Sequence, residues 1–197
     1  MTDVLELLRE RVSIRPDQLV EPAPDDTDIE TMVAAAVTAP DHGGLRPWHF
    51  IVIRGDARGR LGDVFADAAR QRRPSIEPAE LEKLRAKPPR APLVIAVAAA
   101  IRPDHPRVPV IEQIQSASAA AQQLQLAANA LGYGSIWLTG DAAHDPTVTE
   151  ALGLGFDDRL VGFIHIGTID GEPPDRVRPD AAGFLREWTE PLELETL

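Results

Sequence analysis

The run APLVIAVAAAI at positions 91–101 contains no charged or hydrogen-bonding side chain. A strand that faces water on one side alternates polar and apolar residues, so a run without a polar face predicts a strand that is covered on both sides. Such a strand needs other layers above and below it. The run therefore constrains the fold to a sheet inside the molecule, in a protein of the α/β or α+β class.

Helix-forming and strand-forming segments alternate along the chain. Apolar periodicity and breaker residues predict helices at 3–12, 26–39, 56–73, 77–87, 110–131 and 145–153, and further strands at 48–54, 133–139 and 158–168. The prolines between 13 and 24 predict an extended loop there. The helix at 110–131, rich in small residues, is expected to be the central buried helix. Residues 169–197 are expected to form an arm that packs on a partner subunit.

Single residues mark the expected ends of three helices. Thr27, with Glu30 three positions later, has the pattern of a capping box. Gly132 stands where a cap at the C-terminal end of a helix belongs. Asp145 followed by Pro146 is typical of a helix start, with the aspartate as cap and the proline in the first helical position. These signals predict where the second helix begins, where the longest one ends and where the last one begins.

The chain has 197 residues, a formal net charge of -11 and no cysteine. Its length fits one domain, residues 1–197. The negative charge argues against nucleic acid or an anionic membrane as partner, because phosphate-rich surfaces need a basic footprint. The lack of cysteine excludes a disulfide framework and thiolate chemistry. No apolar run is long enough to span a membrane and the first residues do not form a signal peptide, so a cytoplasmic protein is expected.

Several common motifs are absent: no G-x-G-x-x-G follows a strand, and the chain has neither a P-loop nor a G-x-S-x-G elbow. Asp41, His42 and His49 leave a metal site open as an alternative, but their spacing matches no known ligand set, and we expect no metal. His165 lies inside the strand at 158–168 and is expected to be a structural residue that is satisfied within the sheet. His105 and His144 are likewise expected to be structural.

An Arg-x-Ser-x-Arg cluster, formed by Arg11, Ser13 and Arg15, stands at the end of the first expected helix. Arginines in this position commonly just complement the helix dipole. Two guanidinium groups and a hydroxyl also match the oxygens of a phosphate in number and geometry. In so acidic a chain, this cluster is the first candidate for a phosphate site.

Segments in a characteristic order resemble the nitroreductase family. They are the Arg-x-Ser-x-Arg cluster, APDHGGLRPWHFIVI at 39–53, the Ala/Gln-rich helix at 110–131, LGYGSIWLTG at 131–140 and DDRLVGFIHIGT at 157–168. The likeness covers nearly the whole chain and is greatest with short bacterial chains described as NAD(P)H nitroreductases. It implies an α+β fold, with a mixed central sheet flanked by helices, in a homodimer that holds two FMN molecules at the subunit interface.

The resemblance also implies cofactor-binding residues. FMN contacts are implied for Arg11, Val12, Ser13, Arg15, Thr38, His42, Trp137, Leu138 and Thr139, and NAD(P) contacts for Ala127, Ala128, Asn129, Ala130, Leu131 and Gly132. Thr38 matches a position from which close relatives extend an arginine to the FMN of the other chain. Val12 also stands where many relatives have arginine, so the phosphate is expected to depend on Arg11 and Arg15, with Arg176 or Arg178 from the arm.

The activity that the resemblance implies is an FMN-dependent oxidoreductase. NADH or NADPH passes a hydride to flavin N5, and an electron-poor acceptor, nitroaromatic-like or quinone-like, then takes two electrons in a ping-pong sequence. The flavin supplies the redox chemistry, so no catalytic side chain is required, and Arg11 is the lead candidate to stabilise charge at the flavin N1 and C2 carbonyl. The alternatives are a flavin-binding or regulatory protein without turnover, and a relative that uses flavin for dehalogenation or dehydrogenation.

Overall fold

A central antiparallel sheet organises the computed structural model, which describes residues 4–188. Its strands are β1 (Leu19–Val20), β2 (His49–Arg54), β3 (Leu93–Ala99), β4 (Gly134–Leu138) and β5 (Arg159–Ile169). The order is β1-β5-β3-β2, with β4 also paired to β5, and every pair of these strands is antiparallel. In the described part of the chain, parallel pairing is confined to a bridge between Ser13 and Ser135, so the mixed sheet that the resemblance implied is not found there.

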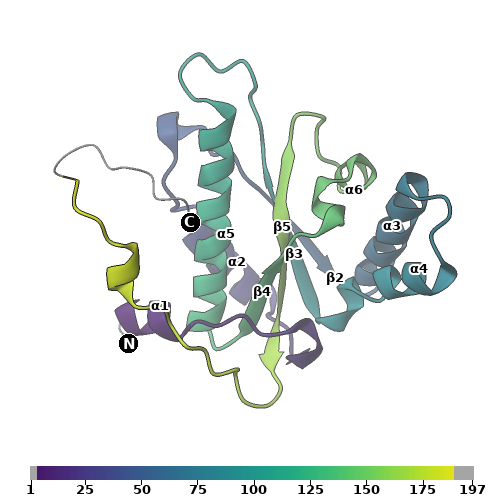
Figure 1. The fold of residues 1–197 in the computed structure, drawn as a ribbon, viewed down its shortest axis with the longest axis horizontal. Helices are drawn as coiled ribbons and strands as arrows, with labels where there is room; N and C mark the ends of the chain where they lie inside the picture. Colours follow the sequence, from purple (N-terminus) through teal and green to yellow (C-terminus); the bar gives the residue numbers. More distant parts are fainter. Residues whose placement is uncertain (1–3, 189–197) are drawn as a thin grey trace.

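Helices cover both faces of this sheet (Figure 1). They are α1 (Val4–Glu10), α2 (Asp26–Ala36), α3 (Ala57–Arg72), α4 (Pro78–Arg85), α5 (Val110–Ala130) and α6 (Pro146–Ala151). Short 3-10 turns η1 (Pro16–Gln18), η2 (His42–Gly44), η3 (Pro88–Arg90), η4 (Asp141–His144) and η5 (Ala181–Phe184) connect them. No helix among residues 4–188 is long and apolar enough to cross a membrane.

Strand β3 lies at the centre, and each of its residues is fully buried. Leu93, Ile95 and Val97 pack with α2 and α5 on one face, whereas Val94 and Ala96 pack with α3 and α6 on the other. The prediction from the run at 91–101, a strand covered on both sides, is confirmed. Helix α5 contributes Ala120, Ala121, Leu124 and Ala128 to the core, as expected of a central buried helix.

The helix ends confirm two of the three expected caps. Helix α5 ends in a Schellman motif, with Gly132 at a φ of 89° and the Tyr133 N–H donating to the Ala128 carbonyl at 2.9 Å. Asp145 caps α6 by accepting a hydrogen bond from the Thr147 N–H at 2.9 Å.

The prediction of a capping box at Thr27 was wrong. Asp25 caps α2, and its carboxylate accepts from the Asp28 N–H at 2.9 Å. The helix starts one residue before Thr27, because an aspartate satisfies the free N–H groups as well as threonine does. The expected loop at 13–24 also contains strand β1, which is only two residues long and is held by pairing with the end of β5.

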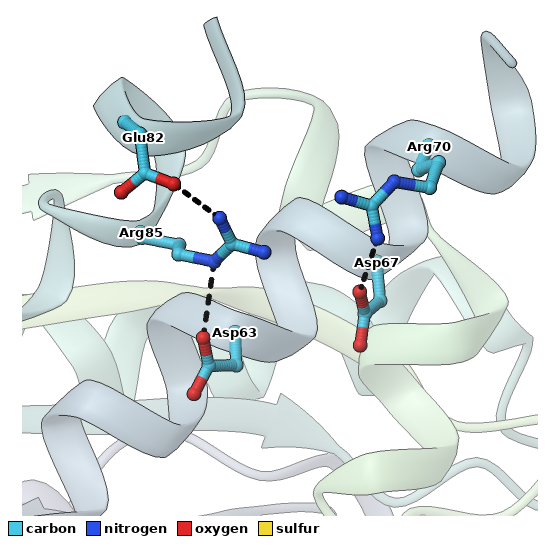
Figure 2. Close-up of polar contacts among 5 residues, drawn as sticks. All are labelled: Asp63, Asp67, Arg70, Glu82 and Arg85. Carbon is cyan, nitrogen blue, oxygen red and sulfur yellow. Dashed lines mark hydrogen bonds and ion pairs between the residues drawn. The ribbon is translucent and has the colours of Figure 1, made fainter. Parts of the chain in front are cut away.

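Helices α3 and α4 form a tight corner beside the sheet (Figure 2). The two helix backbones approach so closely that a Cβ at Gly62 would lie 2.2 Å from the Arg85 carbonyl oxygen. Arg85 joins the two helices, with its Nε donating to Asp63 at 3.1 Å and its Nη1 to Glu82 within α4. The corner is therefore well fixed, and it forms one side of the pocket described below.

Candidate functional site

The segment that follows α1 lies along the edge of β4. The Ile14 N–H donates to the Ser135 carbonyl at 3.0 Å, which holds Ser13 beside Ser135. Ile14 is buried, and Val12 packs on the same small apolar cluster. Val12, where the resemblance implied a contact with FMN, therefore serves packing in this chain. The arrangement places Arg11 and Ser13 beside the start of β4.

Arginines from two distant segments of the chain converge here. We call Arg11, Arg176 and Arg178 the arginine cluster. Arg178 Nη2 donates to the carbonyls of Arg9, at 2.9 Å, and Arg11, at 2.6 Å. Burial, and then the charges of Arg178 and Arg176, lower the pKa of Arg11 from its usual value. Both arm arginines left open by the sequence thus lie close enough to Arg11 to influence it.

The arginine cluster has no anionic partner within residues 4–188, since none of its members joins an ion pair there. Nη1 of Arg11 is buried and has no hydrogen-bond partner in the part of the chain that the structure describes. Buried donors are rarely left unpaired, and like charges repel, so this cluster has the properties of an anion site. Arg15 differs, because its guanidinium binds Asp17 at 2.9 Å in an exposed ion pair.

A pocket of about 610 Å³, the sheet-end pocket, opens where β4 ends. Its wall includes Trp137, Leu138 and Thr139, three residues that the sequence predicted together. Pro16, which continues the segment after Arg11, is also in the wall. The structure therefore connects the arginine cluster to this pocket through one short stretch of chain.

The mouth of the sheet-end pocket carries cations that sequence reasoning missed. Lys87 and Arg90 line it, and neither makes an ion pair or a side-chain hydrogen bond with another residue of the described chain. Arg72, also in the wall, is by contrast neutralised by Asp145 at 2.8 Å. The available signal was two cations in the proline-rich turn just before the buried strand, KPPR at 87–90. A pocket with two unpaired cations favours a ligand with negative charge.

The sequence predicted the strand that contains His165 correctly, but it predicted the surroundings of this side chain wrongly. It lies in β5 as predicted, is 5% exposed and lines the sheet-end pocket. Its Nδ1 has no hydrogen-bond partner among residues 4–188, so the expectation of a histidine satisfied within the sheet was wrong. The residues opposite it in β3 and β4, Val94 and Ile136, offer no polar side chain. Burial lowers the pKa of His165 to about 4, and the ring is neutral at physiological pH.

Thr38 and His42 both lie against α5, at different points along the helix. His42 Nδ1 forms a 2.5 Å hydrogen bond with Glu112 in the first turn of α5, and Thr38 Oγ1 donates to Gln123 at 3.2 Å. Helix α5 has 21 residues and so spans about 30 Å. Ser135, beside the cluster, follows its opposite end. Within one chain, His42 and the arginine cluster are therefore separated by most of the length of α5.

The remaining predicted positions are also placed. Ala128 is buried in the core, while Asn129 to Gly132 form the end of α5 and its cap, before β4 begins. The sheet-end pocket lies at the other end of β4, beside Thr139. His49, on β2, is exposed, and no group of three metal-binding side chains occurs within residues 4–188. Part of the expected arm, residues 189–197, lies outside the described residues.

The structure is that of an α+β protein with two basic features, the arginine cluster and the cations that line the sheet-end pocket. The sequence profile described as "Nitroreductase family" matches residues 8–168. The chain belongs to the nitroreductase family. The family and the α+β class expected from the sequence are thus confirmed, and with them the class of an oxidoreductase.

Individual relatives agree with this membership. The Escherichia coli protein named "Putative NAD(P)H nitroreductase YdjA" is 40% identical over 166 residues, which are 84% of this chain and 88% of that protein. A nitroreductase-like family protein from Bacillus cereus superposes with a TM-score of 0.78 at 24% identity, covering 96% of this chain and 98% of that one. A Desulfovibrio desulfuricans structure, titled as a nitroreductase in complex with FMN, has a TM-score of 0.71 at 26% identity, covering 97% and 99%.

Proposed function

We propose that this protein is an FMN-dependent oxidoreductase that takes a hydride from NADH or NADPH and passes two electrons to an electron-poor acceptor in a ping-pong sequence. The observation that carries the proposal is a cluster of three arginines that forms no ion pair within residues 4–188, and in which Nη1 of Arg11 is buried without a hydrogen-bond partner from those residues. A phosphate dianion would satisfy that donor and offset the mutual repulsion of the cluster. FMN carries such a group, and the names and titles of the relatives support the choice.

The sheet-end pocket is the proposed place of the flavin ring. It is adjacent in the chain to the arginine cluster, and Trp137, Leu138 and Thr139 line it. When bound, FMN supplies the hydride and electron chemistry. Lys87 and Arg90 replace Arg11 as the proposed groups that stabilise negative charge on the ring, because they line the pocket whereas Arg11 lies in the cluster.

The proposed assembly is a homodimer in which each cofactor site uses both chains. His42 cannot join the arginine cluster of its own chain, because most of the length of α5 separates them. A second chain packed in the opposite direction along α5 would bring its His42 to this cluster. Exposed apolar residues on α1 and the arm, among them Val4, Leu8 and Trp188, support a buried interface on this side.

The proposed reductant site includes the end of α5, residues 127–132, and the acceptor is a flat, electron-poor compound such as a nitroaromatic or a quinone. Of the residues in that stretch, Ala128 is buried and packs in the core. Ala130 and Leu131 are exposed in this stretch, and Asn129 is half-buried.

Anaerobic titration of the purified protein tests the proposal. Protein that retains or takes up FMN, and whose flavin is bleached by NADH or NADPH and restored by a nitroaromatic or quinone, would support it. Protein that binds FMN but is not reduced would indicate a flavin-binding module without turnover. Protein that binds no FMN at micromolar concentration would exclude a flavin function of either kind.

A further inference from the structure

The sheet-end pocket contains a buried polar group that the proposed chemistry does not yet use. His165 is 5% exposed and lines this pocket, and its Nδ1 lacks a hydrogen-bond partner within residues 4–188. Phe163, on the same face of β5, is packed edge to face against Phe65 of α3 at 5.1 Å between ring centroids. The imidazole therefore sits in an apolar wall with a polar atom left over.

Such a group lowers the stability of the protein on its own. A buried nitrogen without a partner loses its hydrogen bonds to water and gains nothing in return. A phenylalanine or leucine would fill an apolar wall without that loss. A residue that breaks a local packing rule beside a pocket is commonly one that serves binding.

We propose that His165 is a binding residue of the sheet-end pocket, whose Nδ1 forms a hydrogen bond with the polar edge of a planar heteroaromatic ligand. This proposal rests on the proposed function, under which the ligand is the flavin ring of FMN. A neutral imidazole offers one donor and one acceptor, whereas Lys87 and Arg90 at the mouth can only donate. His165 therefore adds a kind of hydrogen bond that the cations cannot make.

The test uses riboflavin beside FMN, because riboflavin has the ring but lacks the phosphate that the arginine cluster would hold. Kd values are measured by quenching of flavin fluorescence on the apoprotein. In His165→Phe, both ligands should bind about 3- to 10-fold more weakly, the usual contribution of one hydrogen bond. His165→Asn, which keeps a hydrogen-bonding group near Nδ1, should recover much of the affinity. His49→Phe, an exposed position on β2, is the matched control and should change neither Kd.

The same variants separate binding from a structural role. The apoprotein of His165→Phe should melt at the same temperature as the wild type or higher, because an unpaired polar group is removed. Unchanged Kd values for both flavins would overturn the proposal, and Nδ1 would then be satisfied by an ordered water. Failure of the unmutated protein to bind FMN would instead refute the proposed function itself.

A measurement on the unmutated protein makes the test independent of folding of the variants. Histidine labelled with 15N in the ring reports the hydrogen bonding of each nitrogen. Addition of FMN should shift the Nδ1 resonance of His165, and riboflavin should shift it in the same direction. A resonance that stays in place while the flavin binds would contradict the assignment.

Discussion

Gly162 leaves room for the indole of Trp137, since a Cβ at Gly162 would lie 2.2 Å from Trp137 Nε1 and 2.9 Å from the Leu138 carbonyl oxygen. Nε1 donates to the Val161 carbonyl at 3.1 Å, which fixes the ring against β5. The position of Trp137 in the wall of the sheet-end pocket thus depends on a missing side chain on the neighbouring strand.

Gly162→Ala should therefore displace Trp137. Overpacking of this kind costs about 1–3 kcal/mol, and we expect a lower Tm together with weaker binding of FMN and riboflavin. Differential scanning calorimetry and fluorescence titration measure the two effects. Gly59→Ala in α3, where a Cβ meets no atom within 4 Å, should instead leave both unchanged or raise the Tm. Equal Tm values for Gly162→Ala and the wild type would show that the strand can move to accommodate the methyl group.

Arg11→Ala should weaken FMN binding by about 1.5–3 kcal/mol, the usual contribution of a hydrogen bond to a charged group. Riboflavin should bind as it does to the wild type, because it brings no phosphate to the arginine cluster. Isothermal titration calorimetry with both flavins measures the difference. Arg60→Ala, which removes an exposed arginine of α3, controls for the loss of positive charge. An equal loss for FMN and riboflavin would mean that Arg11 supports the ring and not the phosphate.

Lys87→Gln and Arg90→Gln should lower the reduction potential of bound FMN, because each removes a cation that favours negative charge on the reduced ring. Both side chains are exposed and screened, so the expected interaction is up to about 1 kcal/mol, or roughly 20 mV for a two-electron couple. Spectroelectrochemical titration at low and high salt measures it, and the shift should shrink with salt. Lys83→Gln, on α4 outside the pocket, should leave the potential unchanged.

Stability should depend on pH through His165. In the unfolded chain the imidazole titrates near 6.5, and in the folded chain burial moves its pKa to about 4. Between these values the unfolded state binds the proton and the folded state does not, so stability falls as the pH drops from about 6.5 to about 4 and levels off below. The full effect is on the order of 3 kcal/mol. Urea unfolding of His165→Phe should show a smaller acid loss than the wild type by this amount, while His49→Phe should follow the wild type.

Much of the fold follows from local patterns that no tertiary contact overrides. The strand at 91–101 and the helix at 110–131 were predicted because their character extends over many residues, and the cap at Gly132 requires a conformation that glycine adopts easily. Strand β1 could not be predicted, because two residues carry no periodicity and their pairing with β5 depends on a partner far along the chain. Asp25 and Thr27 are both good caps by residue type, so the sequence alone did not decide between them, and in the structure Asp25 is the cap.

The residues of the candidate site likewise fall into those that the sequence could predict and those that it could not. Arg11 and Ser13, and the run from Trp137 to Thr139, were found because each lies in one short segment that resembles a family pattern. Lys87 and His165 were not found as site residues, because they reach the sheet-end pocket only after α4 and β5 have packed around it. The missing partner of His165 Nδ1 is a property of its neighbours in space, and nothing in the flanking isoleucines indicates it.

Because α5 separates His42 from Arg11 within one chain, two different variant chains should complement each other in a mixed dimer if each cofactor site uses both chains. A chain with Arg11→Ala still supplies an intact His42, and a chain with His42→Ala still supplies an intact Arg11. A mixed dimer of the two would contain one doubly damaged site and one with no substitution at all. Two preparations that each bind FMN weakly, unfolded and refolded together, should therefore regain part of the wild-type FMN affinity, whereas each refolded alone should not. Absence of such complementation would place both residues in a site made by a single chain.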